Sequence, residues 1–246
     1  MRVAALYDIH GNLPALEAVL AEVDEAKVDT ILIGGDVASG PMPAETMALL
    51  EARSEEVRFV RGNADRVLDF SGNPGGDLEL WRQSRLWVAE QIGERRLELL
   101  AALPLDETID IDGLGAVRFC HGAPGSDEEV ITRVTPEDRL LGLLEGVAEQ
   151  VVVCGHTHVQ FDRKVRDKRV ANAGSVGFPY EAAPAAYWLV LGPDLSFRRT
   201  DYDVARAVEL ILTTGFPNRE KYARDLAEVD PERPERLSRL IEFGPD

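Results

Sequence analysis

Short apolar runs alternate with helical patterns along the first sixty residues. Leu16, Leu20 and Val23 are spaced as one face of a helix, and Asn12 is placed to cap that helix. The elements predicted over this stretch are, in order, VAALY (3–7), that helix, TILIGGD (30–36), a helix over 43–53 and VRFVRGN (57–63). A β-α-β-α-β order of this kind predicts neighbouring parallel strands.

The pattern changes after residue 65. Residues 70–77 predict a turn-rich loop, and residues 77–104 predict one or two helices. Trp81 and Trp87 in this stretch fit either core packing or a cap over a pocket. The segments that then predict strands are ETIDI, AVRFC, VVVC, KVRDKRVANAG, AAYWLVLG and SFRRTDY, with a hairpin around Arg166, Asp167 and Lys168.

The chain ends in helical patterns over 203–212 and 231–243, with Asp230 before Pro231 as the predicted start of the second. We find no internal repeat, linker or low-complexity segment. We therefore expect one domain over residues 1–246, with a helical insertion at about 66–104 and a helical C-terminal tail at about 201–246.

The net charge and the cysteine content limit which partners and which cellular location we expect. The chain has 27 Lys and Arg against 44 Asp and Glu, a net charge of −17 that disfavours nucleic-acid polymers and anionic membranes as partners. No run of about 18 apolar residues exists, and Asp8 interrupts the N-terminal apolar stretch too early for a signal peptide, so we expect a cytoplasmic location. Cys120 and Cys154 each end an apolar run and predict buried thiols in a reducing compartment.

All four histidines lie in polar segments that follow predicted strands. The five segments of this kind are DIHGN (8–12), GGD (34–36), GNAD (62–65), HG (121–122) and GHTH (155–158). Because ligands of α/β sheets collect beyond the carboxyl ends of the strands, we expect these segments to meet at one rim.

The side chains of these segments are those that bind transition metals. Asp8 and His10 are two residues apart, as are His156 and His158, so each pair shares one face on a regular strand. Imidazole suits Zn, Mn, Fe, Co and Ni, whereas carboxylate and amide oxygens suit harder ions. The seven candidate ligands are Asp8, His10, Asp36, Asn63, His121, His156 and His158. They suffice for two metal ions if Asp36 bridges them.

The glycines beside these ligands have a predicted role as well. Gly35, Gly62, Gly122 and Gly155 let the chain turn tightly at a strand end and pass close to a metal or phosphate. Asn172 fits either a residue that supports the site or a plain Gly-rich turn.

Taken in this order, the motifs DxH, GD, GN, H and GHxH resemble those of the calcineurin-like metallophosphoesterases, over residues 1 to about 200. The IHGN start and the GPMP turn (40–43) are most similar to the small bacterial and archaeal phosphodiesterase branch. The resemblance implies a four-layer α-β-β-α sandwich, in which two packed mixed β-sheets are flanked by helices.

The resemblance also implies a dinuclear site and a reaction. One divalent ion would be held by Asp8, His10, Asp36 and His158, and the other by Asp36, Asn63, His121 and His156. A metal-bridging water or hydroxide would attack phosphorus in line, with both ions stabilising charge on the oxygens. We expect two Mn ions, with Fe, Ni, Zn or Co as alternatives, and we expect Asp36, Asn63 and His121 to act in catalysis.

Two departures from the family pattern affect the predicted chemistry. The family often has a histidine directly after the ligand Asn, where it helps to protonate the leaving group, and this chain has Ala64. Esters with good leaving groups are therefore expected to react best. In addition, GDVASGP stands where protein Ser/Thr phosphatases and dinucleoside-tetraphosphate hydrolases resemble each other in GDxVDRG, which disfavours those two substrate classes.

Three hypotheses follow for function. The first is a phosphodiesterase acting on small phosphoesters, and the second is a phosphomonoesterase or nucleotidase of the same fold. The third, a non-catalytic binding scaffold on this fold, expects eroded ligands, whereas all seven candidate side chains are present. Substrate phosphate is expected to meet arginines from the set Arg61, Arg66, Arg82 and Arg85, unless these are solvated surface side chains.

Overall fold

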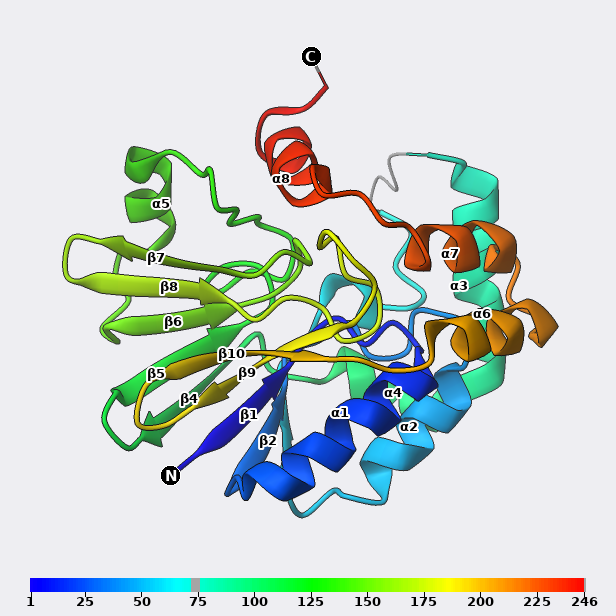
Figure 1. Ribbon diagram of the computed structural model, residues 1–246, viewed down its shortest axis with the longest axis horizontal. Helices are drawn as coiled ribbons and strands as arrows, with labels where there is room; N and C mark the ends of the chain where they lie inside the picture. The colour runs from blue at the N-terminus through cyan, green and yellow to red at the C-terminus, as the bar shows by residue number, and fades with distance from the viewer. Residues whose placement is uncertain (72–75, 246) are drawn as a thin grey trace.

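The computed structural model describes residues 1–71 and 76–245 and contains two five-stranded sheets (Figure 1). The first sheet has the strand order β10-β9-β1-β2-β3 and the second β4-β5-β6-β8-β7. The strands of the first sheet are β1 (Val3–Leu6), β2 (Thr30–Ile33), β3 (Val57–Phe59), β9 (Ala186–Leu191) and β10 (Leu195–Thr200). Those of the second are β4 (Asp106–Ile111), β5 (Gly115–Cys120), β6 (Val151–Cys154), β7 (Phe161–Val165) and β8 (Lys168–Asn172).

Both sheets are mixed. Strands β1, β2 and β3 are parallel, as the β-α-β-α-β pattern predicts, whereas β9 and β10 are antiparallel to their neighbours. In the second sheet β5, β6 and β8 are parallel, and β7 and β8 form the predicted hairpin, whose turn contains Arg166 at a positive φ of 51°. The carboxyl ends of the parallel strands of each sheet therefore lie along one edge.

Three apolar clusters account for the layers. Side chains of both sheets, such as Val3 and Leu32 from one and Phe119 and Val153 from the other, form the core between them. The outer face of the first sheet packs on helices through a second cluster, and the outer face of the second sheet packs on α5 through a third. This is the predicted four-layer α-β-β-α sandwich.

The helices are α1 (Leu13–Ala26), α2 (Pro43–Glu51), α3 (Leu78–Ile92), α4 (Glu94–Ala101), α5 (Glu137–Leu143), α6 (Val204–Thr213), α7 (Arg219–Leu226) and α8 (Arg233–Phe243). The side chain of Asn12 caps α1 by accepting a hydrogen bond from the amide of Ala15 at 3.3 Å, as predicted. The stretch predicted as an insertion contains α3 and α4, separated by Gly93. Of the turn predicted at 70–77, residues 72–75 lie outside the described part of the chain.

Two expectations about helices were wrong. The last helix begins at Arg233, with Glu232 as its N-cap, so Asp230 and Pro231 do not start it. Helices α5 and α7 were not predicted at all. Helix α7 carries few apolar residues, whereas the segment of α5 has Leu140, Leu143 and Leu144 in a helical spacing that the prediction overlooked.

Candidate metal centre

The candidate ligands lie on loops just beyond the strand ends, and their backbone is unusual. Five of the seven non-glycine residues with positive φ in the described structure are candidate ligands: Asp8 (53°), His10 (46°), Asp36 (54°), His156 (65°) and His158 (57°). Non-glycine residues seldom adopt this left-handed conformation, which costs roughly 1–2 kcal/mol for most of them. The fold therefore holds these residues in strained turns, as is common at functional sites.

This geometry corrects one expectation. The pairs Asp8 and His10, and His156 and His158, do not share the face of a strand, because β1 ends at Leu6 and β6 ends at Cys154. The left-handed turns beyond the strands bring them together instead.

Glycines permit the close approach of these turns. A Cβ on Gly62 would lie 2.2 Å from Oδ1 of Asp36, and one on Gly155 would lie 2.7 Å from Oδ2 of Asp8. Both distances are shorter than any real Cβ contact, so a side chain at either position would displace a candidate ligand. Asn172 supports the GHTH loop from below, because its buried amide donates to the carbonyl of Gly155 at 2.5 Å and to Oγ1 of Thr157 at 3.0 Å.

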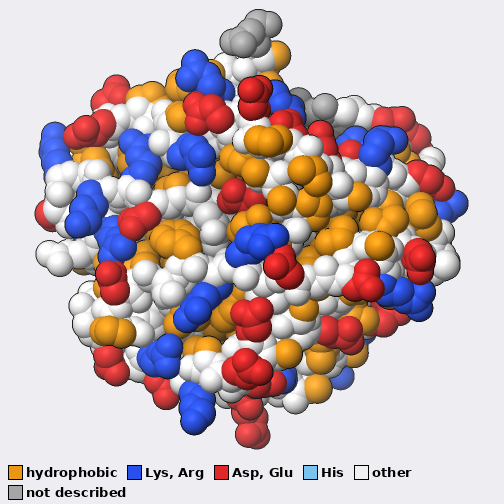
Figure 2. All heavy atoms as spheres, viewed as in Figure 1, with side chains coloured by type: hydrophobic (Ala, Val, Ile, Leu, Met, Phe, Trp, Pro, Cys, Tyr) orange, Lys and Arg blue, Asp and Glu red, His pale blue; other side chains and the backbone are white. Residues whose placement is uncertain are grey.

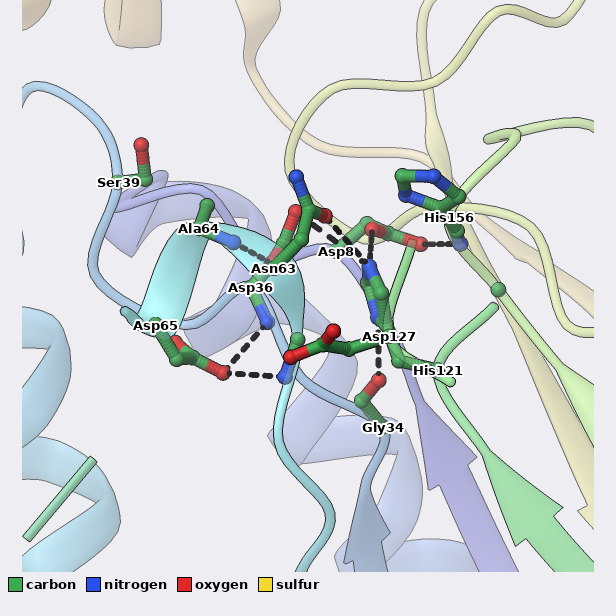
Figure 3. Close-up of polar contacts among 12 residues, drawn as sticks. Asp8, Gly34, Asp36, Ser39, Asn63, Ala64, Asp65, His121, Asp127 and His156 are labelled. Atoms are coloured by element: carbon green, nitrogen blue, oxygen red, sulfur yellow. Dashed lines mark hydrogen bonds and ion pairs between the residues drawn. The ribbon is translucent and has the colours of Figure 1, made fainter. Parts of the chain in front are cut away.

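All seven side chains come together in two neighbouring groups. Asp8, His10 and His158 form one group, and Asp36, His121 and His156 form the other, each with its ligand atoms within 4.8 Å of one another. Oδ1 of Asn63 lies 3.2 Å from Nε2 of His121 and extends the second group (Figure 3). Oδ2 of Asp36 lies 3.6 Å from Nε2 of His10 in one group and 3.6 Å from Nε2 of His121 in the other.

The two carboxylates are held in the same way. Oδ2 of Asp8 accepts the amide of His156 at 2.9 Å, and Oδ1 of Asp36 accepts the amide of Ala64 at 2.8 Å (Figure 3). In each case the second oxygen faces the imidazoles. Oδ1 of Asp8 is buried and accepts no hydrogen bond from any described residue. A buried carboxylate oxygen of this kind is costly unless a cation is bound to it.

Backbone carbonyls orient three of the four imidazoles. Nδ1 of His10 faces the carbonyl of Ser39 at 3.2 Å, Nδ1 of His121 that of Gly34 at 2.8 Å, and Nδ1 of His158 that of Phe178 at 2.6 Å. Since a carbonyl only accepts, each Nδ1 carries the hydrogen and each Nε2 is left to coordinate a metal.

The pKa values of several side chains in the cluster are strongly shifted. Burial, followed by the neighbouring His121, lowers the pKa of His156 to about 4, so its imidazole is neutral at physiological pH. Burial alone would also lower the pKa of His158, but the Asp8 carboxylate outweighs it and the net pKa is raised. Burial would raise the pKa of Asp8, yet the adjacent imidazoles, led by His158, hold it well below its usual value.

Asp65 holds the backbone of the site but is not one of the candidate ligands. It is fully buried, and its carboxylate accepts the amides of Asp36 at 2.9 Å, Val37 at 3.0 Å and Gly62 at 2.9 Å. Burial and the charge of Asp36 raise its pKa to about 7. It faces the backbone below Asp36 rather than the open side of the cluster, so it is not placed to protonate a leaving group (Figure 3).

A cavity of about 810 Å³ opens above the cluster and is lined by His10, Asp36, Asn63, His156 and His158 among others. Of the four candidate arginines, Arg66 and Arg85 line it, whereas Arg61 and Arg82 do not. Trp81 is on the cavity wall, while Trp87 packs against Phe216 at 5.6 Å between ring centroids. Trp81 therefore fits the predicted cap over a pocket, and Trp87 fits the predicted core packing.

Three aromatic residues at the site were not anticipated. The carbonyl of Phe178 anchors His158, the ring of Tyr180 stacks on His158 at 4.7 Å, and the hydroxyl of Tyr222 donates to the carbonyl of His10 at 3.0 Å. The FPY segment directly after the Gly-rich turn offered a signal for the first two. Tyr222 lies on α7, far along the chain, and no sequence pattern links it to His10.

The donor set fits two divalent cations. Imidazole Nε2 atoms and carboxylate oxygens converge from both groups, and Nε2 of His10 lies only 3.2 Å from Nε2 of His158. Two unprotonated nitrogens facing each other at this distance repel, and a shared cation removes that repulsion. Asp36 stands between the groups as a bridging ligand would.

Comparisons with known proteins agree with this geometry. Residues 1–191 match the calcineurin-like phosphoesterase superfamily domain. An uncharacterized protein of Methanocaldococcus jannaschii is 26% identical over 242 residues, covering 87% of this chain and 93% of its own. The crystal structure of a metallophosphoesterase from Sphaerobacter thermophilus is similar with a TM-score of 0.72 and 26% identity, covering 92% of this chain and 98% of its own. A hypothetical protein of Pyrococcus horikoshii shares the fold with a TM-score of 0.79 at 21% identity, over 92% of this chain and 98% of its own.

Proposed function

The chain belongs to the calcineurin-like phosphoesterase superfamily, and from this premise we propose that it hydrolyses small phosphodiesters at a dinuclear metal site. Membership makes it a metal-dependent phosphoester hydrolase. The diester preference and the pair of ions are the added proposal. The observation that carries it is the convergence of seven candidate ligands in two adjoining groups, five of them lining one cavity.

We assign the ligands to two ions that share Asp36. Asp8, His10 and His158 would complete one ion, and Asn63, His121 and His156 the other. Bound divalent ions supply Lewis-acid charge for the phosphoryl oxygens and activate water as a nucleophile. We propose Mn for both positions, because the mixture of imidazole and carboxylate donors suits it.

Backbone groups of the chain orient the candidate ligands before any ion binds. Carbonyls of Ser39, Gly34 and Phe178 hold three imidazoles in one orientation, so little reorganisation is needed when ions bind. Ala64 lines the cavity beside Asn63 and brings no proton donor. Leaving groups that carry negative charge easily are therefore the preferred ones.

Two features favour a diester over a monoester. The cavity extends well beyond the ligands, and a volume of about 810 Å³ is in the range of sites that enclose drug-sized molecules. Its outer wall carries the acids Asp69, Asp77, Glu128 and Asp225. A monoester brings two negative charges to such a wall, whereas a diester brings one.

The test compares bis(4-nitrophenyl) phosphate with 4-nitrophenyl phosphate on Mn²⁺-loaded protein. We expect the diester to have the higher kcat/KM. A higher value for the monoester would favour the phosphomonoesterase or nucleotidase, and no turnover of either, with both ions bound, would favour the non-catalytic scaffold.

We also infer a reducing, cytoplasmic location, with neither a nucleic-acid polymer nor a membrane as partner. Both cysteines are buried free thiols, which is typical of proteins kept in a reducing compartment. Within the described residues, no helix combines the length and the apolar character that crossing a membrane requires. Acidic and basic side chains are interspersed over one face of the molecule, with no broad basic area on that face for a nucleic acid (Figure 2).

A further inference from the structure

The cavity has an aromatic wall beside its metal-binding floor. The aromatic residues that line it are Trp81, Phe178, Tyr180, Phe216 and Tyr222. They come from three separate parts of the chain: α3, the loop after β8, and the α6–α7 region. In the fold, α3 and α7 lie on the same side of the first sheet (Figure 1).

Part of this wall is rigid and adjoins the candidate ligands. The rings of Phe178 and Tyr222 are 4.6 Å apart, and the hydroxyl of Tyr222 is fixed by the carbonyl of His10. Phe178 lies 6.3 Å from the rings of both His10 and His158. An organic group attached to phosphorus therefore meets aromatic surface close to the reacting atoms.

Trp81 completes the wall from α3. Its ring is half-buried, with Phe70 packed edge-on at 5.9 Å and the Arg85 guanidinium 5.0 Å from its centroid. Arg85 is itself held by the carbonyl of Val67 at 2.8 Å, so the indole has a fixed support. The contact between Trp87 and Phe216, one turn and a half further along α3, joins this helix to the loop before α7.

The charges on the cavity wall disfavour further anionic groups. The acids there outnumber the cations Arg66, Arg85 and Lys221 among the described lining residues. Each of these cations already has partners. Arg66 pairs with Asp69, Asp127 and Glu128, Arg85 donates to backbone carbonyls, and Lys221 pairs with Asp225. A second phosphate on the substrate would find no unpaired cation among these residues.

We infer that the cavity selects esters with a single phosphate group and a planar, uncharged aromatic substituent. Trp81 and Phe178 are the specificity-determining residues, and helix α3 supplies substrate recognition rather than chemistry. This inference rests on the proposed phosphodiesterase function, whose substrate class it specifies.

The first test holds the leaving group constant. Methyl 4-nitrophenyl phosphate and phenyl 4-nitrophenyl phosphate both release 4-nitrophenolate, so only the retained substituent differs. We expect kcat/KM of the Mn²⁺-loaded protein to favour the phenyl ester by about tenfold. Trp81→Ala should reduce this ratio by about 3–10-fold, the usual contribution of one aromatic pair. Trp81→Phe should keep the ratio within about twofold, because a ring is retained.

Leu86→Ala is the matched control, since Leu86 lies on the same helix, is 54% exposed and is not part of the cavity wall. It should leave the ratio unchanged. Comparing variants cancels the difference in intrinsic reactivity between the two esters. An unaltered ratio in Trp81→Ala, or an equal loss in Leu86→Ala, would overturn the role of Trp81.

The second test needs no turnover. Calorimetry should show phenylphosphonate binding the Mn²⁺-loaded protein more tightly than methylphosphonate, and Trp81→Ala should remove most of that preference. A distal charge, in 4-carboxyphenylphosphonate, should weaken binding by about 3–10-fold relative to phenylphosphonate. Equal or tighter binding of the carboxylate would refute the charge selection. Ring-selective binding without hydrolysis of any diester would refute the proposed function alone, whereas hydrolysis without ring preference would refute this inference alone.

Discussion

The Asp65 carboxylate holds the backbone of Asp36, and the Asp36 carboxylate in turn holds the backbone beside Asp65. Oδ2 of Asp65 accepts the amide of Asp36 at 2.9 Å, and Oδ1 of Asp36 accepts the amide of Ala64, next to Asp65, at 2.8 Å (Figure 3). The segments GGD and GNAD are thereby locked together, although they follow different strands. The position of the central carboxylate of the site thus depends on a second carboxylate beneath it.

Removal of the Asp65 carboxylate should therefore destabilise both fold and site. Asp65→Ala leaves the amides of Gly62, Asp36 and Val37 buried without an acceptor, and each such amide costs about 1–3 kcal/mol. We expect a loss of about 3 kcal/mol in the free energy of unfolding, measured in urea, and fewer metal ions bound. Glu17→Ala on the exposed face of α1 is the control and should stay within about 0.5 kcal/mol of the unmodified protein. A similar small change in Asp65→Ala would exclude the structural role.

The sequence predicted most of the fold because its central strands are short apolar runs and its first helix has a helical spacing of apolar residues. The runs that became β1 and β6 are apolar throughout, β2 is apolar after Thr30, and Asn12 gave a clear helix start. By contrast, α7 has few apolar residues, and it is a helix because Tyr222 and Leu226 pack against the rest of the molecule. Tertiary packing of this kind leaves no local signal.

The candidate ligands were recognisable because their residue types are rare and follow strands. Their geometry was not predictable, since it depends on left-handed turns at Asp8, His10 and Asp36, and no local sequence pattern specifies which Asp or His adopts this conformation. The role of Tyr222 also required the structure, because it contacts His10 across most of the length of the chain.

We predict a strict metal requirement. The buried Oδ1 of Asp8, without a hydrogen-bond donor among the described residues, indicates a cation as its partner. Exhaustive chelation should abolish diesterase activity, and Mn²⁺ should restore it better than Mg²⁺ or Ca²⁺, because imidazole ligands disfavour the harder ions. Elemental analysis should accompany each assay. Full activity in protein shown to be metal-free would exclude the dinuclear assignment.

Asp36 and Asp8 should differ in how much each contributes to metal binding. Asp36 faces histidines of both groups at equal distances, whereas Oδ1 of Asp8 lies nearest to His158, at 3.2 Å. Asp36→Asn should therefore weaken the binding of both ions, and Asp8→Asn chiefly that of one. The number of ions bound per chain, measured for both variants, is the readout. Two ions retained in Asp36→Asn but lost in Asp8→Asn would assign the bridge to Asp8 instead.

Both thiols should be unreactive in the native protein. Burial raises the pKa of Cys154 to about 12 and that of Cys120 well above its usual value. A rise from 9.0 to about 12 lowers the thiolate fraction of Cys154 at pH 8 roughly 1000-fold, and the thiolate is the reactive form. A thiol reagent such as dithionitrobenzoate should modify two cysteines per chain in guanidinium chloride and almost none without it. Rapid modification of the native protein would mean that these strands open readily.

The last prediction concerns proton donation to the leaving group. Ala64 lines the cavity directly beside Asn63, where related enzymes often place a histidine, and Asp65 is turned toward the backbone amides below. A positioned general acid contributes about 10²–10⁴-fold, and its absence is felt most by basic leaving groups. Hydrolysis should therefore fall steeply as the pKa of the leaving group rises, and aryl esters should react far faster than alkyl esters of similar size.

Ala64→His should flatten this dependence, and it should help alkyl esters more than aryl ones. The gain should fall short of the full range, because Ala64 is largely buried and a ring needs more room than a methyl group. Ala64→Leu is a control for added bulk, since it fills the same space without a titratable group, and it should not improve alkyl esters. The series of leaving groups on the unmodified protein is the decisive measurement, because no substitution perturbs it. A flat dependence there, with chemistry shown to limit the rate, would mean that another group supplies the proton. The Asp65→Asn variant would then test the acid that follows Ala64 in the chain, since it removes the titratable proton while keeping the shape of the side chain.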